Sequence, residues 1–333
     1  MKSKIEHFKF LFISVLVILM VSYGQYISWK LTHQDHIGDL MAASDGVLNG
    51  TPHWRAFQNR LLAPTLVWLL STFHHHPFMI FVGISLVGLN FCLFYMVKNH
   101  TKNNGYAFLS LILVSIFWVF LQDFWSYPWD FLEAFCLLFL AYSAIIESGI
   151  SPVLIVFMVS LFNRESSVFF GLYILFCGLS AAWYGKYMRR KTIYYGLFMI
   201  VISIISTEIM RKYLFKGSML PGIGLDNYHK TFENHFLLNE NFENISSGFA
   251  IHIIKLKSLF AAFSLFLISS YFFYNGICRK NEYLTAIGLT FVLYFISIFV
   301  FGSITETRIY QPFCWSCAFL VSELTIRFRK TKT

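Results

Sequence analysis

Long apolar segments separated by short polar stretches are the feature that most restricts how this chain can fold. Hydrophobic residues make up 57% of the chain and charged residues only 13%, whereas soluble domains carry about 25% charged residues. Because about 20 apolar residues in a helix cross a bilayer, the pattern predicts an all-α, polytopic transmembrane helical bundle. The predicted spans, about ten in number, are residues 10–29, 78–97, 106–121, 131–146, 152–162, 168–183, 193–210, 258–274, 284–301 and 309–326.

Basic residues between the spans predict the orientation of the bundle. Cytoplasmic loops carry an excess of Lys and Arg, and here such residues gather at both chain ends and in alternate turns: Lys98 and Lys102, then Lys186, Arg189, Arg190 and Lys191, then Arg279 and Lys280. Ten spans therefore place both termini in the cytoplasm. We expect residues 1–333 to form a single integral membrane domain with outer loops at 30–77 and 211–257. The second loop is also basic, but long loops weigh little in this rule.

Residues 60–73 are apolar but short, and Pro64 interrupts their start. We interpret them as a helix that lies on the membrane or dips into it, because a full crossing would move the basic turn at 186–191 to the outside. The net charge of +9 is explained by basic cytoplasmic loops, so we expect no nucleic-acid partner. Cys314 and Cys317 lie one helical turn apart without a second pair, which favours packing thiols over a metal or redox site.

Three charged segments fall on the outer side, and we expect them to build one site. Asn163-Arg164-Glu165-Ser166 places a cation and an anion between two apolar runs. Charges at membrane depth are costly and usually face a protein interior or a wet cavity, where they carry function. The other two segments are residues 35–60, after the first span, and Glu306-Thr307-Arg308, before the last one.

The acidic residues of these segments are candidates for proton transfer. Asp35 and Asp39 are four residues apart and share a face if the loop is helical there. A carboxylate in a water-poor cleft acts as a general base or holds a divalent cation, although the spacing alone slightly favours surface acids of a solvated loop. Asp130 and Glu133 lie one turn apart at the start of the fourth span, where an acid also stabilises a helix start.

The arginines of the same segments are candidates for phosphate binding. Arg55 and Arg60 flank a mixed segment at the outer interface, where they either bind phosphate oxygens in a fork or extend toward lipid headgroups. We expect Arg164 and Glu165 to pair with the charges of 306–308 across the bundle. Such a network either stabilises buried charges or positions a base and a phosphate-binding arginine.

Taken together, the chain resembles the GT-C superfamily of membrane glycosyltransferases. The motifs that carry the resemblance are Asp35 with Asp39, Arg60-Leu61-Leu62-Ala63-Pro64, Asp130, Asn163-Arg164-Glu165-Ser166, and Glu306-Thr307-Arg308-Ile309-Tyr310-Gln311-Pro312. The resemblance implies a polyprenyl-phosphate sugar donor, inverting transfer to a surface glycan or lipid acceptor, and an active site on the outer face of the bacterial inner membrane. It places an essential acid at Asp39 or Asp35. The chain departs from the superfamily in its short length, in lacking a C-terminal soluble domain, and in its Asp-x-x-x-Asp spacing.

The leading hypothesis is therefore a glycosyltransferase in a lipid membrane. Its candidate catalytic acids are Asp39, Asp35 and Glu165, and its candidate substrate-binding residues are Arg60, Arg164, Arg308, Glu306, Asp130 and Arg55. No motif indicates a cofactor, and the question of a divalent cation stays open. A transporter or flippase of a lipid-linked sugar or anion is the first alternative, although the charges cluster toward one face and no repeat is visible. A polysaccharide polymerase is the second.

Overall fold

The computed structural model describes residues 2–53, 55–122, 126–186, 190–217, 238–239, 241–243, 253–302 and 309–330, and the regular structure of these residues is entirely helical. The helices of the first half are α1 (Lys2–His33), α2 (Ile37–Asn49), η1 (Arg55–Asn59), α3 (Leu62–Ser71), α4 (Pro77–Thr101), α5 (Asn104–Leu121) and α6 (Pro128–Ile145). Those of the second half are α7 (Ile150–Leu161), η2 (Glu165–Ser167), α8 (Val168–Trp183), α9 (Arg190–Tyr213), α12 (Ile253–Arg279), α13 (Glu282–Phe301) and α14 (Phe313–Lys330).

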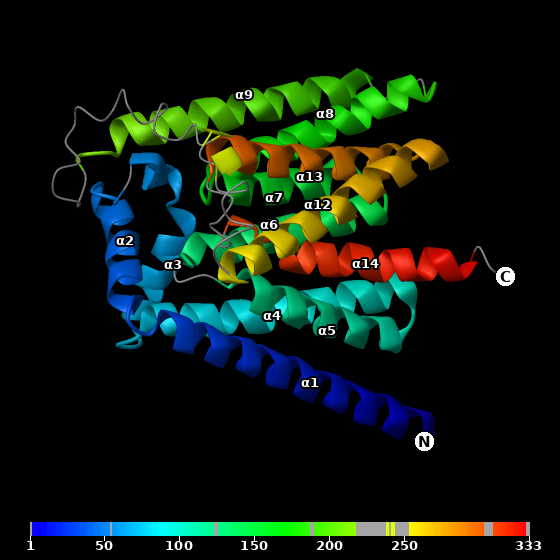
Figure 1. Cartoon of the computed structure of the whole chain (residues 1–333), viewed down its shortest axis with the longest axis horizontal. Helices are drawn as coiled ribbons and strands as arrows, with labels where there is room; N and C mark the ends of the chain where they lie inside the picture. The colour runs from blue at the N-terminus through cyan, green and yellow to red at the C-terminus, as the bar shows by residue number, and fades with distance from the viewer. Residues whose placement is uncertain are drawn as a thin grey trace.

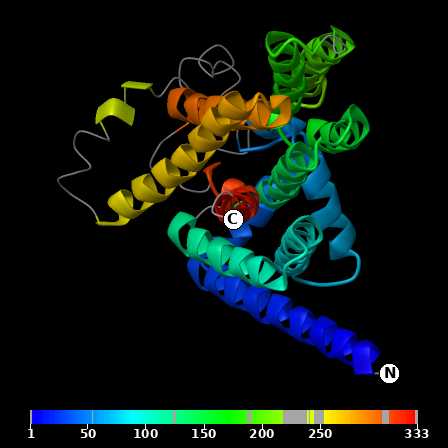
Figure 2. The ribbon, with the colours of Figure 1, turned by 90° about the vertical axis from the view of Figure 1, so that its right-hand side faces the viewer.

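The long helices lie roughly along one direction, whereas α2 lies across one end of the bundle beside α3 (Figure 1). The start of α1 and the end of α14 lie at the opposite end, as expected for termini on the same side of a membrane. Figure 2 looks along the bundle from that opposite end and shows α14 near its centre. In agreement, every residue from Phe313 to Leu320 is buried.

Each predicted span overlaps a helix, and seven of the described helices are long and apolar enough to cross a membrane. These seven are Phe8–His33, Pro77–Thr101, Asn104–Leu121, Pro128–Ile145, Glu165–Trp183, Lys191–Tyr213 and Glu282–Phe301. They indicate an integral membrane protein, while the count of ten and the orientation stay predictions. Helix α7 covers about 18 Å at 1.5 Å per residue, which is less than the hydrocarbon thickness of about 30 Å.

Helix α3 (Leu62–Ser71) is the short segment that we expected to lie on the membrane or dip into it. It is shorter than the seven long apolar helices. It packs on α4, α2 and α6, and the Leu62 N–H donates to the Phe162 carbonyl oxygen at 2.8 Å. That bond ties the start of α3 to the end of α7, at the end of the bundle where the charged residues gather.

Asn90 of α4 connects three helices inside the bundle. Its Nδ2 donates to Ser22 Oγ at 2.9 Å and to Gln25 Oε1 at 2.7 Å, both in α1, and its Oδ1 accepts from Trp315 Nε1 of α14 at 2.9 Å. All four side chains are buried. This network fixes how α1 and α14 lie against α4.

Replacing Asn90 with leucine is expected to lower the free energy of unfolding by about 1–2 kcal/mol. The substitution leaves the Trp315 N–H buried without an acceptor, and interhelical hydrogen bonds in membranes contribute up to about 1.7 kcal/mol. The midpoint of thermal unfolding of the detergent-solubilised protein measures the effect. Ile84→Leu, at a site of α4 that is 62% exposed, is the control, and equal midpoints for both variants would show that the network contributes nothing.

Candidate functional site

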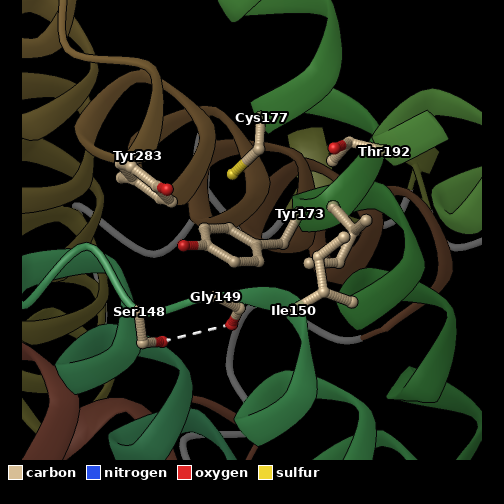
Figure 3. Close-up of a pocket in the computed structure, with 8 residues that line it drawn as sticks. Ser148, Gly149, Ile150, Tyr173, Cys177, Thr192 and Tyr283 are labelled. Atoms are coloured by element: carbon tan, nitrogen blue, oxygen red, sulfur yellow. Dashed lines mark hydrogen bonds between the residues drawn. The ribbon is translucent and has the colours of Figure 1, made fainter. Parts of the chain in front are cut away.

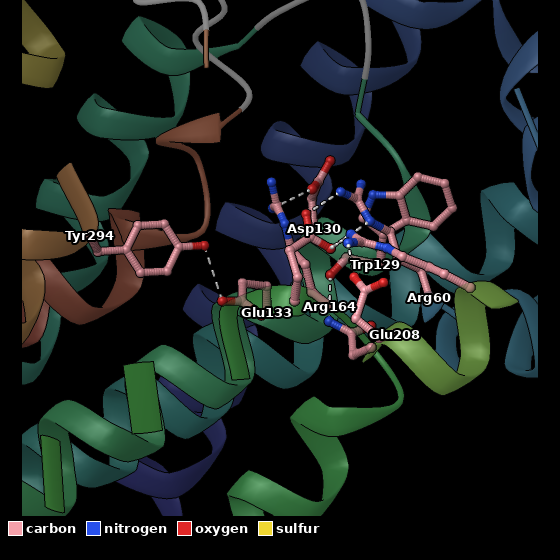
Figure 4. Close-up of polar contacts among 10 residues, drawn as sticks. Arg60, Trp129, Asp130, Glu133, Arg164, Glu208 and Tyr294 are labelled. Carbon is pink, nitrogen blue, oxygen red and sulfur yellow. Dashed lines mark hydrogen bonds and ion pairs between the residues drawn. The ribbon is translucent and has the colours of Figure 1, made fainter. Parts of the chain in front are cut away.

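The charged residues meet where η1, the start of α6, the turn between α7 and α8 and the end of α9 come together (Figure 4). Helix α7 ends at Leu161 and the next helical turn begins at Glu165, so Asn163 and Arg164 lie in the turn between them. Asn163 Nδ2 donates to the Trp129 carbonyl oxygen at 2.9 Å, which fixes the turn against α6. This contact therefore positions the charged side chains of Arg164 and Glu165 at one end of the apolar bundle.

Arg60 and Glu165 form the first ion pair. Arg60 Nη2 lies 2.5 Å from Glu165 Oε1, and Arg60 Nε donates to Oε2 at 3.3 Å. The guanidinium also lies 4.3 Å from the Phe57 ring and 5.1 Å from the Trp129 ring. Burial lowers the pKa of Arg60 and Glu165 opposes that change. Because the ordinary pKa of arginine is above 12, the group stays charged and Glu165 is the anion that compensates it.

Arg164 and Asp130 form the second ion pair, with Nη1 3.1 Å from Oδ1. Asp130 is in the first turn of α6, which Pro128 begins, and its Oδ2 accepts from the Tyr127 N–H at 2.9 Å. Both Arg164 and Asp130 are buried. A buried pair of this kind is strongly destabilised when one partner is removed.

Arg211, near the end of α9, brings a third cation to the cluster. It lies 3.9 Å from Glu165 Oε2 and 3.5 Å from Glu208 Oε1. Glu208 is largely exposed, whereas Glu165 lies between Arg60 and Arg211. Three segments that are distant in the sequence, at Arg60, Arg164 and Arg211, therefore each contribute one cation to the same cluster.

A second layer lies one helical turn deeper. Glu133 of α6 is fully buried, and its Oε1 accepts from the Tyr294 hydroxyl of α13 at 3.2 Å. Figure 4 shows the Tyr294 hydroxyl and the Glu133 carboxylate pointing toward each other, to the left of the ion pairs. Ser166 lies beside both Glu133 and Tyr294.

Several buried polar atoms of this cluster have no hydrogen-bond partner among the described residues. They are the donors Trp129 Nε1 and Arg164 Nε, the acceptors Glu133 Oε2 and Asn163 Oδ1, and the Ser166 hydroxyl. Buried polar groups are satisfied in the large majority of cases. These atoms are the groups of the described cluster that a polar ligand or an ordered water would satisfy.

The structure brings together five of the residues that the sequence indicated, namely Arg60, Asp130, Glu133, Arg164 and Glu165. We expected Arg164 and Glu165 to pair with Glu306 and Arg308, but their described partners are Asp130 and Arg60. Positions 306 and 308 lie outside the described residues, as does the side chain of residue 55. Gln311, from the same motif as residue 306, accepts from Ser126 Oγ at 2.8 Å, so the end of this motif lies beside the start of α6.

Asp35 and Asp39 lie between the end of α1 and the first turn of α2. Asp35 is in the turn before α2, so the two acids do not share a helical face. Asp39 is in the first turn of α2, with its side chain 63% exposed and one oxygen 3.7 Å from His36 Nδ1. No described contact joins either acid to the ion pairs. Their role as the essential acid stays a prediction of the resemblance.

Sequence reasoning missed three residues of the cluster: Arg211, Trp129 and Tyr294. Arg211 follows an apolar span and counted only as a loop charge. Tyr294 lies within an apolar run, where nothing distinguishes it from a packing aromatic. Within the described residues, no three His, Cys, Asp or Glu side chains converge as a metal site.

A cavity of about 250 Å³ lies at the other end of the bundle (Figure 3). Its lining residues are Ser148, Gly149, Ile150, Tyr173, Ile174, Cys177, Thr192 and Tyr283. They come from the turn between α6 and α7, the start of α7, the middle of α8, the start of α9 and the start of α13. The ion pairs lie at the start of α6 and the end of α9. None of the lining residues belongs to the ion-pair cluster, so the cavity is separate from it.

Comparison of the chain with protein-family models, curated proteins and solved structures finds no match.

Proposed function

We propose that the chain is a GT-C-like membrane glycosyltransferase. It moves a sugar from a polyprenyl-phosphate donor to a surface glycan or lipid acceptor on the outer face of the bacterial inner membrane. The observation that carries this proposal is the set of unsatisfied donors and acceptors around Arg60 and Arg164, at one end of an apolar bundle.

A glycosyl phosphate complements this set chemically. Its phosphate oxygens accept hydrogen bonds, as the Arg164 and Trp129 N–H groups require, and its sugar hydroxyls donate, as Asn163 Oδ1 requires. The prenyl chain is apolar and suits the lipid-facing sides of the helices. One ligand thus accounts for the charge, the hydrogen bonding and the membrane setting of the cluster.

The arginines would stabilise the leaving polyprenyl phosphate. Charge develops on the phosphate as the sugar leaves, and donors that are already oriented stabilise that charge most effectively. Glu165 and Asp130 hold Arg60 and Arg164 in place before the substrate arrives. Arg55, Arg308 and Glu306 stay candidates for contacts to the same donor.

A transporter or flippase of a lipid-linked sugar or anion is the second candidate. The break between α7 and α8 and the buried Glu133 favour it, because transporters bind substrates at interrupted helices. Movement of the lipid across vesicles without sugar transfer would support this alternative. A polymerase would instead alter the length distribution of the glycan.

Binding of undecaprenyl phosphate by the full chain in lipid nanodiscs tests the proposal. Saturating lipid at about 100 times the dissociation constant is expected to add about 2.7 kcal/mol to the free energy of unfolding. Arg60→Gln is expected to weaken binding about 10- to 100-fold, since hydrogen bonds to charged groups contribute about 1.5–3 kcal/mol.

Two further variants make this test specific. Lys98→Gln removes a cation at the other end of α4 and should bind like the wild type. Arg60→Gln combined with Glu165→Gln removes both charges of the pair, which separates loss of binding from loss of stability. Equal binding by the wild type and Arg60→Gln, or no binding by either, would contradict the proposed site.

A further inference from the structure

Two carboxylates of the site are fully engaged by the protein itself. Asp130 accepts with Oδ1 from Arg164 and with Oδ2 from the Tyr127 N–H. Glu165 accepts with both oxygens from Arg60. A carboxylate whose oxygens are held by cations and amides is a poor proton acceptor, since its ionised form is already stabilised. These two acids are therefore suited to hold arginines in place.

Glu133 differs from the other acids of the described cluster. Glu208 is 62% exposed and pairs with Arg211, whereas Glu133 is fully buried. Among the described residues, Oε1 of Glu133 accepts from the Tyr294 hydroxyl and Oε2 has no hydrogen-bond partner. The Ser166 hydroxyl lies beside the Glu133 carboxylate. Glu133 thus offers a buried acceptor oxygen to a substrate hydroxyl.

The position of Glu133 relative to the arginines suits proton transfer. Residues three apart on a helix share a face, so Glu133 lies one turn below Asp130. Arg164 pairs with Asp130 and also acts electrostatically on Glu133. This cation supplies the positive charge that a buried ionised carboxylate needs. The same guanidinium would contact the phosphate of the donor. The phosphate would therefore lie close to Glu133 Oε2.

We infer that Glu133 is the general base of the transfer, an inference that rests on the proposed function. Glu133 Oε2 accepts the proton of the acceptor hydroxyl while the hydroxyl oxygen forms a bond to the anomeric carbon of the sugar. The bond from that carbon to the phosphate oxygen breaks, and its electron pair leaves with the polyprenyl phosphate. Arg60 and Arg164 stabilise the new negative charge. Tyr294 is a positioning residue that orients the carboxylate through Oε1.

This assignment differs from the one that the family resemblance implies. Asp39 is exposed and pairs with His36, and no described contact connects it to the two arginines. Glu133 lies within the cluster and is buried. In the cluster, a proton acceptor and a phosphate-binding cation would act on the same substrate. The two assignments predict opposite results for substitutions at 133 and 39.

Glu133→Gln is the decisive variant because it keeps the shape of the side chain and removes the base. General bases contribute about 10²- to 10⁴-fold, so sugar incorporation into the host glycan is expected to fall at least about 100-fold at equal protein level. Binding of undecaprenyl phosphate should stay within about twofold of the wild type, because the arginines are unchanged. Glu323→Gln, a buried acid paired with His100, is the matched control and should transfer like the wild type.

Two more conservative variants test the inference if the Glu133→Gln protein does not accumulate in the membrane. Glu133→Asp retains a carboxylate that is one methylene shorter, and about a tenfold loss of transfer is expected. Tyr294→Phe removes only the orienting hydrogen bond, so a smaller loss with unchanged lipid binding is expected. Wild-type transfer by both of these variants would overturn the inference.

The outcomes separate the inference from the proposed function. Wild-type transfer by Glu133→Gln, with Asp39→Asn inactive, overturns the base assignment and leaves the transferase standing. Loss of both transfer and lipid binding in Glu133→Gln also overturns it, since Glu133 would then hold the donor. A wild-type protein that neither binds undecaprenyl phosphate nor changes the host glycan removes the proposed function, and the inference with it.

Discussion

Arg164→Gln is expected to lower the free energy of unfolding by about 3–5 kcal/mol and to abolish sugar transfer. The substitution leaves Asp130 buried without its cation and removes a positive charge that acts on Glu133. Removing one partner of a buried ion pair lowers the free energy of unfolding by about 3–5 kcal/mol, because the remaining buried charge is uncompensated. Unfolding of the purified protein in detergent, followed by heat or by a denaturing detergent, measures the loss.

Two variants control for this result. Arg164→Gln combined with Asp130→Asn removes both charges and is expected to recover much of the lost stability, although not the transfer. Arg211→Gln removes a cation that is more exposed than Arg164, and a loss below about 1 kcal/mol is expected. An Arg164→Gln protein that unfolds like the wild type would show that the pair with Asp130 does not stabilise the fold.

Gly288→Ala is expected to destabilise the protein by about 3 kcal/mol or more, because α12 and α13 pack backbone against backbone at this position. A Cβ atom at residue 288 would lie 2.2 Å from the Phe273 nitrogen and 2.5 Å from its Cα. Small residues allow such close helix contacts in membranes, and overpacking costs about 1–3 kcal/mol or more when backbones must separate.

Gly24→Ala in α1 is the matched control, since an added Cβ there meets nothing within 4 Å. It should be neutral or slightly stabilising because alanine favours a helix over glycine by about 1 kcal/mol. The thermal unfolding midpoints of the two variants check the prediction. If Gly288→Ala and Gly24→Ala unfold at the same temperature, this result would contradict the close packing of α12 against α13 at residue 288.

The helices were predictable from sequence because apolar runs of sufficient length leave few alternatives in a membrane. The interruption at Asn163 and Arg164 was predictable too, since charged residues there divide two apolar runs. The turn at Asp35 was not, because α1 continues through the polar residues Lys30–His33 and moves the start of α2 to residue 37. Polar residues are compatible with a helix that extends beyond the apolar core, so hydropathy does not define its end.

The pairing of charges was beyond sequence reasoning. Arg60 and Glu165 are 105 residues apart, and their contact depends on how α3 packs against the end of α7. The charge types indicated that partners were needed, but not which ones. Tyr294 gave no signal in an apolar span, and its role follows only from the 3.2 Å contact to Glu133.

Mass spectrometry of the host's surface glycan tests the transferase proposal most directly. The comparison uses a strain without the protein, the same strain restored with the wild type, and one restored with Arg60→Gln at equal protein level. We expect the loss of one sugar in the first strain, its return in the second, and little or no return in the third. An identical glycan in all three strains would contradict a transferase and turn attention to transport of a lipid-linked sugar or anion.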